Sequence, residues 1–164
     1  MTNEQILAEL KEKFPEAIVE VPELIDFTVA IKPEAVTEVA RFLHDECGLD
    51  YLALLTAVDQ PERFEVVYHL WSIKDRTTEP FVLKAYIEDK ENPTVPSVTP
   101  LWRGANYQER EAYDLMGIRF EGHPNLKRLV LWEGFPGHPL RKDFENRTYT
   151  FEELKPTRPT GPEW

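Results

Sequence analysis

A short stretch between residues 109 and 131, EREAYDLMGIRFEGHPNLKRLVL, brings acidic, basic and histidine side chains close together. Glu109, Glu111, Asp114 and His123 are the residue types that general acid–base catalysis uses. Glu111 and Asp114 are three residues apart, so on a helix they would share one face. The stretch has no nucleophile elbow, no Gly-rich phosphate loop and no Ser or Cys beside a histidine. Catalysis by this chain alone is therefore the weaker interpretation.

Metal binding has even less support in the sequence. The four histidines are His44, His69, His123 and His138, and they form neither an HExxH motif nor a close pair. Cys47 is the only cysteine, and one thiolate cannot hold an iron–sulfur cluster. His123 and His138 each lie in a Gly-His-Pro run, where we expect the ring nitrogens to bond backbone groups or a carboxylate.

Docking on another protein is the third interpretation of the same region. The last third of the chain carries the basic residues Arg110, Arg119, Lys127, Arg128, Arg141 and Lys142, interleaved with Tyr107, Tyr113, Phe120, Trp132 and Phe135. Arginine and aromatic residues are enriched at protein interfaces. On a helix Arg110 can pair with Asp114, and Tyr107 with Glu111. We expect paired, partly buried charges at Glu109, Arg110, Glu111 and Asp114.

Composition limits the classes of partner. The 164 residues are enough for one domain, and the net charge of −11 argues against nucleic acid or an anionic membrane surface. No apolar run approaches the roughly 18–20 residues of a membrane-spanning helix. The first residues lack the features of a signal peptide, and a single cysteine is typical of a reducing, cytosolic compartment.

The elements that must position these residues follow from hydrophobic periodicity. We predict helices over 3–14, 33–47 and 107–116, with Asn106 and Glu109 at capping-box spacing, and strands over 17–21, 25–31, 51–58, 63–74, 80–88 and 129–131. This order lacks strict strand–helix alternation. It predicts an α+β fold, a mostly antiparallel sheet with helices packed on one face. Residues 1–144 would form a single domain, and 145–164 an extended, Pro-containing tail.

The charged stretch also resembles a known family signature. Glu109-Arg110-Glu111, Asp114-Leu115-Met116, His123 and Lys127-Arg128-Leu129-Val130, followed by GHPLRKDF, are similar to the 30 kDa subunit family of NADH:quinone oxidoreductase, respiratory complex I. The resemblance covers residues 50 to 144 well and the first fifty in outline. Lys127 stands where the family often has arginine, which keeps the charge and loses the planar fork.

The resemblance implies a non-catalytic subunit of the hydrophilic arm, on the cytoplasmic side of the bacterial membrane. The parent complex passes electrons from NADH through FMN and iron–sulfur clusters to quinone, coupled to proton translocation. This chain would hold no cofactor, since FMN and the clusters belong to partner subunits. Its partners would be the subunit related to the hydrogenase large subunit and the subunit with the last cluster, near the quinone site. Its role would be in the assembly of the complex and in shaping the region near the quinone site.

The interface residues that this implies are the four charged helix residues together with His123, Lys127, Arg128, His138 and Arg141. Three alternatives stay open. The chain could belong to a ferredoxin-fed quinone reductase or a membrane-bound hydrogenase, it could be an independent enzyme using Asp114 and His123, or it could be a free-standing adaptor.

Overall fold

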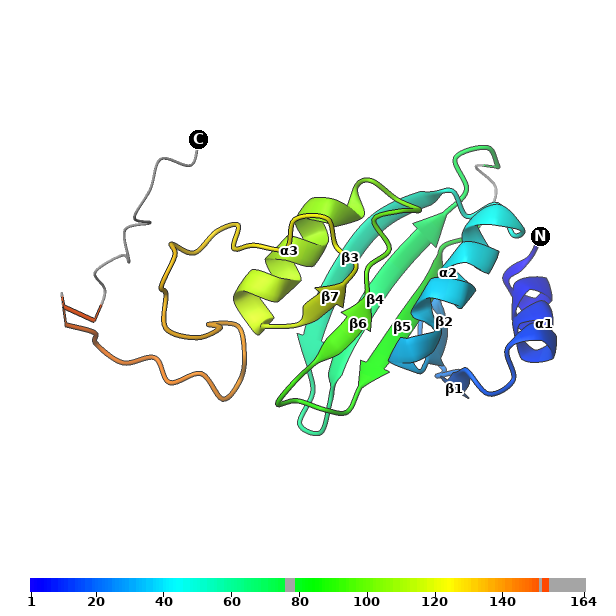
Figure 1. Cartoon of the computed structure of the whole chain (residues 1–164). Helices are drawn as coiled ribbons and strands as arrows, with labels where there is room; N and C mark the ends of the chain where they lie inside the picture. Colours follow the sequence, from blue (N-terminus) through cyan, green and yellow to red (C-terminus); the bar gives the residue numbers. More distant parts are fainter. Residues whose placement is uncertain (76–78, 151, 154–164) are drawn as a thin grey trace.

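The computed structural model describes residues 1–75, 79–150 and 152–153. Its described residues include a main sheet of five strands in the order β1-β2-β5-β4-β3 (Figure 1). These strands are β1 Ile18–Glu20, β2 Phe27–Ile31, β3 Tyr51–Asp59, β4 Phe64–Trp71 and β5 Phe81–Ile87. The β2–β5 pair is parallel and the other pairs are antiparallel. The predicted α+β fold with a mostly antiparallel sheet is confirmed.

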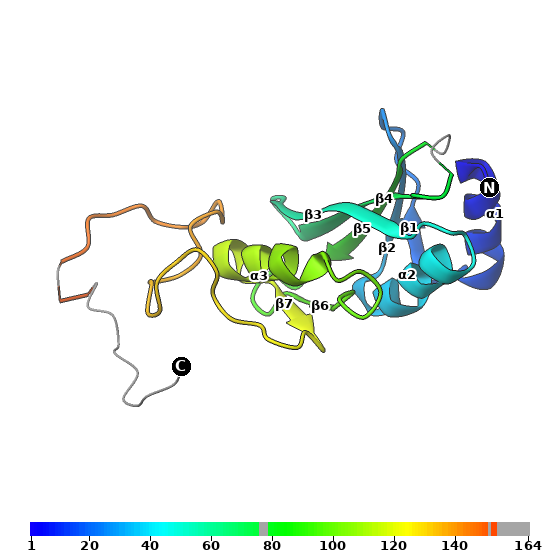
Figure 2. The same cartoon turned by 90° about the horizontal axis from the view of Figure 1, so that it is seen from above.

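The helices are α1 Asn3–Lys13, α2 Val36–Asp45 and α3 Ala105–Met116, each close to a predicted range. Figure 2 shows α2 and α3 along the same face of the sheet. The first helix packs beside α2, where the rings of Phe14 and Phe42 meet at 5.8 Å. Pro33 opens a short 3-10 turn, Pro33–Ala35, which leads into α2 because its missing N–H costs nothing at a helix start.

The core lies between this helical layer and the sheet. On β4, Phe64, Val66 and Tyr68 point toward the helices and are at most 1% exposed. Burial of each such side chain contributes about 1.5–3 kcal/mol. The opposite face of the sheet is more polar, since Lys84 and Glu65 form an ion pair there at 3.0 Å. β4 is buried along most of its length because it is an inner strand, between β5 and β3.

Two short strands were missed in the sequence. The segment between the predicted strand 80–88 and the predicted helix 107–116 contains β6 Thr94–Pro96, which pairs in parallel with β7 Arg119–Glu121 directly after α3. Three residues with two prolines nearby show no periodicity, so only the tertiary pairing makes them strands. The pair brings the start and the end of the 94–121 region together around α3.

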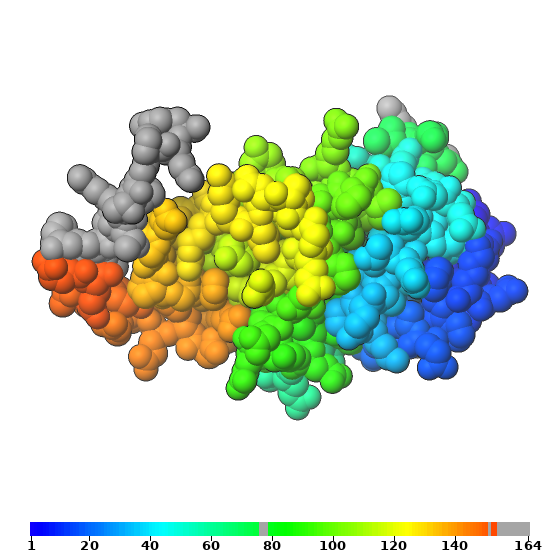
Figure 3. Space-filling model, viewed as in Figure 1, coloured from blue at the N-terminus to red at the C-terminus, as the bar shows by residue number. Residues whose placement is uncertain are grey.

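After β7 the described chain has no further helix or strand. It forms the end of the molecule opposite α1 (yellow to orange in Figure 3) and then leads away from the domain. Residues 145–150 and 152–153 of the predicted tail are irregular, and the rest of the tail lies outside the described residues.

Candidate interaction site around Asp114

Asp114 lies in the last turn of α3, and its side chain is completely buried. The helix ends at Gly117, whose φ of +74° is accessible to glycine at little cost. A side chain on Gly117 would also collide with the imidazole of His138, because a Cβ there would lie 2.6 Å from its Cδ2. The chain turns sharply here, and the segment after β7 can fold back over the helix end.

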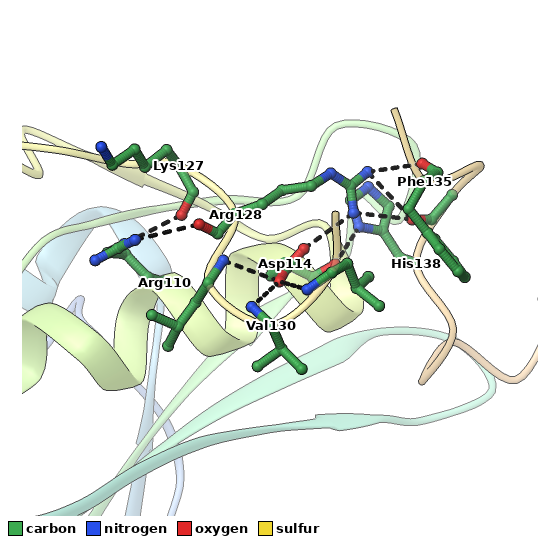
Figure 4. A network of polar contacts seen from close by, with 10 residues as sticks. Arg110, Asp114, Lys127, Arg128, Val130, Phe135 and His138 are labelled. Atoms are coloured by element: carbon green, nitrogen blue, oxygen red, sulfur yellow. Dashed lines mark hydrogen bonds and ion pairs between the residues drawn. The ribbon is translucent and has the colours of Figure 1, made fainter. Parts of the chain in front are cut away.

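The carboxylate of Asp114 accepts four hydrogen bonds from residues 128–131 of this segment (Figure 4). The backbone N–H groups of Leu129, Val130 and Leu131 donate to Oδ2 at 3.0, 2.7 and 2.9 Å. Arg128 donates to Oδ1 at 3.0 Å. Burial alone would raise the pKa of Asp114, but these donors together hold the pKa below its ordinary value. The carboxylate is therefore ionised and fixes the loop.

This geometry corrects the predicted strand at 129–131. Three consecutive N–H groups converge on one oxygen, which is incompatible with the alternating directions of N–H groups in a strand. The apolar run Leu129–Leu131 resembles a strand only because its side chains are apolar.

Two arginines hold the same segment by its carbonyl oxygens. Arg110 donates from Nε to the carbonyl of Lys127 at 3.1 Å and from Nη2 to that of Arg128 at 3.2 Å. The guanidinium of Arg128 also donates to the carbonyls of Phe135 and Gly137 at 3.2 to 3.4 Å. The planar fork of arginine suits such paired acceptors.

The segment also satisfies the carbonyl groups left open at the end of α3. His138 Nδ1 donates to the carbonyl of Asp114 at 2.9 Å, and Arg141 Nε donates to that of Met116 at 2.6 Å. The N–H of Leu140 donates to the carbonyl of Leu115 at 3.0 Å. Burial is the main cause that lowers the pKa of His138, and neighbouring arginines lower it further, so the imidazole is neutral at pH 7. These three donors cap the helix.

A further anchor was missed in the sequence. Asp59, at the end of β3, is 3% exposed and accepts the N–H of Lys142 at 2.8 Å and the ammonium of Lys90. Burial opposes its ionisation, yet these donors lower the pKa of Asp59 below its ordinary value. Because 83 residues separate Asp59 from Lys142, no local pattern could have indicated the contact.

The predicted charge pairs need correction. Arg110 does not pair with Asp114. The guanidinium of Arg110 donates to backbone carbonyls of the segment after β7, and Asp114 is paired with Arg128 instead. Tyr107 lies under the Arg110 guanidinium, 5.6 Å from its ring centre, and not against Glu111. Glu111 is exposed and makes no ion pair or hydrogen bond among the described residues. A tertiary partner with several donors outcompetes a solvated contact one turn away.

Glu109 and His123 form a separate group at the start of α3. Glu109 is completely buried and accepts the hydroxyl of Ser97 and the N–H of Val98. It does not cap the helix with Asn106, since α3 begins at Ala105. His123 donates from Nε2 to the carbonyl of Asn106 at 3.1 Å. The expectation that both Gly-His-Pro histidines bond backbone groups is confirmed.

The catalytic pairing of Asp114 with His123 fails on this geometry. His123 contacts residue 106 in the first turn of α3, and Asp114 lies in its last turn. Eight helical residues span about 12 Å along the axis. Asp114 and His123 therefore share no site at which a proton could pass between them and one substrate.

The described residues also hold no group of three or more His, Cys, Asp or Glu side chains that could bind a metal ion. None of the described helices is long and apolar enough to cross a bilayer.

The residues from 127 to 141, called here the docking segment, present apolar side chains to solvent from a fixed backbone. Val130 is 67% exposed, Trp132 45% and Leu140 56%. Trp132 stacks edge-on against Phe135 at 4.8 Å. Lys127 is exposed, and its ammonium has no bonded partner among the described residues. A rigid loop with apolar, aromatic and cationic side chains is the composition of an interface.

A family described as "Respiratory-chain NADH dehydrogenase, 30 Kd subunit" matches residues 29–150. The chain belongs to this family. The resemblance inferred from the charged stretch is thereby confirmed, and the match includes α3, the Asp114 site and the docking segment.

Relatives in this family extend over most of the chain. A relative from Roseiflexus sp. (strain RS-1) is 41% identical over 169 residues, covering 93% of this chain and 92% of the relative. Another, from Moorella thermoacetica (strain ATCC 39073 / JCM 9320), is 43% identical over 148 residues, covering 88% and 97%. Both relatives are named as the same subunit of an NADH-quinone oxidoreductase.

Solved structures agree on the fold. A structure titled "Nqo5 of the trypsin-resistant fragment (1-134) in P63 form" has a TM-score of 0.63 and 37% identity, covering 77% of this chain and all of that one. A chain of a membrane-bound sulfane sulfur reductase, described as an archaeal respiratory membrane complex, has a TM-score of 0.72 over 98% of this chain and 95% of that one. At 24% identity, this second likeness shows the fold alone.

Proposed function

We propose that this chain is a non-catalytic, cofactor-free subunit of the hydrophilic arm of NADH:quinone oxidoreductase, and that it acts in assembly and in shaping the region near the quinone site. The parent complex would carry electrons from NADH through FMN and iron–sulfur clusters to quinone, coupled to proton translocation. The chain would join the membrane peripherally through the complex, on the cytoplasmic side. The observation that carries this proposal is the exposed, rigidly held docking segment in a chain of the 30 kDa family.

The partners that we propose are two neighbours in the hydrophilic arm, the hydrogenase-like subunit, related to the hydrogenase large subunit, and the last-cluster subunit, which bears the final iron–sulfur cluster. The docking segment offers each an apolar contact around Val130 and Trp132, bordered by the free charge of Lys127. Its backbone donors and acceptors are already bonded within this chain at Asp114 and Arg110. Ordering of the loop therefore costs little on binding.

A tagged chain purified from gently solubilised native membranes tests the proposal, with the retained proteins identified by mass spectrometry. Recovery of the hydrogenase-like and last-cluster subunits together with the flavin subunit supports it. Clusters without a flavin subunit would instead indicate a ferredoxin-fed relative or a membrane-bound hydrogenase. Recovery of the chain alone from the soluble fraction would refute the subunit assignment.

A matched pair of variants locates the contact. Val130→Asp places a charge on the docking segment, and Ile25→Asp places one on the loop between β1 and β2, where Ile25 is fully exposed. We expect Val130→Asp to lower recovery of the partners by tenfold or more, since a desolvated charge is costly, and Ile25→Asp to leave it unchanged. Equal recovery with both variants would remove the docking segment from the interface.

A further inference from the structure

A second polar group, at the other end of α3, takes no part in the docking segment. The side chains of Glu109 and His123 are both fully buried, with Oε2 and Nε2 4.0 Å apart. Oε1 of Glu109 accepts the N–H of Val98 at 2.8 Å, and Oε2 is bonded to the hydroxyl of Ser97 at 2.7 Å. These two bonds are neutral, and a buried carboxylate without a cation is costly.

His123 does not supply that cation in the observed geometry. Its Nε2–H donates to the carbonyl of Asn106, and its Nδ1 accepts the N–H of Asn125 at 3.0 Å. A nitrogen that accepts a hydrogen bond carries no proton, so the ring is the neutral Nε2–H tautomer. A proton on Nδ1 would point at the N–H of Asn125, so two hydrogen-bond donors would face each other at this turn.

No other described titratable group around the site neutralises Glu109. Tyr68 reaches it from β4, and its buried hydroxyl has no hydrogen-bond partner among the described residues. Burial first, and then the charge of Glu109, raise the pKa of that hydroxyl. On α3 itself, Arg110 and Asp114 are bonded to the docking segment. Arg103 lies outside, on the surface.

A path of hydroxyl groups leads from Glu109 to the surface. Ser97 Oγ lies 2.8 Å from Thr99 Oγ1, and either oxygen can donate. Thr99 is partly exposed and lines a surface depression together with Arg103, Asn106 and Gly122. When Glu109 holds a proton, Oε2–H donates to Ser97 and Ser97 donates to Thr99. When the proton leaves to water, both hydroxyls turn and donate inward.

We propose that Glu109 is a buried proton-binding site, and that its proton is exchanged with solvent through the hydroxyls of Ser97 and Thr99. Burial, the largest contribution, raises the pKa of Glu109 to about 7 against the opposing bonds from Ser97 and Val98, in agreement with this geometry. The site would change its charge within the neutral range, where an exposed glutamate is always ionised.

Carboxyl carbon NMR of the full chain labelled with 13C-glutamate tests the proton site. We expect one glutamate to titrate with a midpoint near pH 7, and that signal to be lost in Glu109→Gln and kept in Glu111→Gln, an exposed position on the same helix. If Glu109→Gln does not fold, through-bond correlation to the Glu109 backbone assigns the signal in the natural chain. Titration of every glutamate below about pH 5.5 would overturn the proposal.

Thr99→Val tests the hydroxyl path separately, because it removes the outer hydroxyl and leaves both bonds to Glu109 in place. We expect the midpoint to stay the same and proton exchange to slow, so that two carboxyl resonances replace one averaged resonance near the midpoint. An unchanged line shape in Thr99→Val would refute the path.

Discussion

Replacement of Asp114 by asparagine is the sharpest perturbation of the interaction site. The side chain keeps its size, but one of the two oxygens becomes an NH2 donor. If the remaining oxygen faces the N–H groups of residues 129–131, the new amide opposes the donor of Arg128. If the amide is flipped, three backbone N–H groups lose their acceptor.

The cost follows from burial and from the number of bonds. The side chain is completely buried, whereas Arg128 is 24% exposed at its side chain. A broken buried ion pair costs about 3–5 kcal/mol, and the partial exposure of Arg128 favours the lower end. We therefore expect a loss of about 3 kcal/mol, concentrated in the docking segment. Since 1.4 kcal/mol is about a factor of ten, amides 129–131 should exchange hydrogen about a hundredfold faster.

Hydrogen exchange and denaturant unfolding of the full chain measure both effects, with Glu111→Gln as the control that makes the same chemical change at an exposed site of α3. The pKa of Asp114 is lowered, so its stabilisation is present above the unfolded value of 3.8 and is lost as the pH falls through the folded pKa. Asp114→Asn should lose this acid dependence. If amides 129–131 were protected in Asp114→Asn as well as in the unmodified chain, the Asp114 carboxylate would not be what holds this segment.

Four further outcomes are expected. Arg110→Ala should cost about 1–2 kcal/mol in denaturant unfolding and reduce assembly, since two carbonyls lose a charged donor. Gly117→Ala should destabilise by clearly more than Gly48→Ala, because φ is positive at both but only Gly117 lacks room for a Cβ. Alkylation of Cys47 at pH 8 should be about a thousandfold slower than that of an ordinary thiol, because burial raises its pKa to about 12. The raised pKa of Glu109 should lower the free energy of unfolding by about 3 kcal/mol as the pH rises from 4.5 through 7, a decline that Glu109→Gln should lack.

Periodicity predicted the regular elements because it reports which face is buried. The stripe of α2 and the alternation on β4 needed no knowledge of partners to be recognised. The same reasoning fails for β6 and β7, which are three residues each and exist only through their mutual pairing. It also fails for residues 129–131, where Leu129 and Val130 are exposed while the backbone N–H groups donate to Asp114.

For the charged residues of the site, the sequence indicated the residues themselves but not the partners that they contact. Residue types and spacing drew attention to Asp114, Arg128 and His138, which belong to the stretches that resemble the family, and the structure brings these three residues together. Their partners were not predictable from helix geometry, which paired Arg110 with Asp114. The contact between Asp59 and the backbone of Lys142 depends on a fold that brings distant segments together, so the sequence carried no local signal for it.

Hydroxyl-radical footprinting of Trp132 measures directly whether the docking segment is covered by partner subunits in the complex. Its side chain is 45% exposed in the free chain, on the segment proposed to meet the hydrogenase-like and last-cluster subunits. The free chain and the complex purified from native membranes would be oxidised under the same conditions and compared by mass spectrometry. We expect severalfold less oxidation of Trp132 in the complex. Equal oxidation in a complex that retains the chain would contradict this expectation.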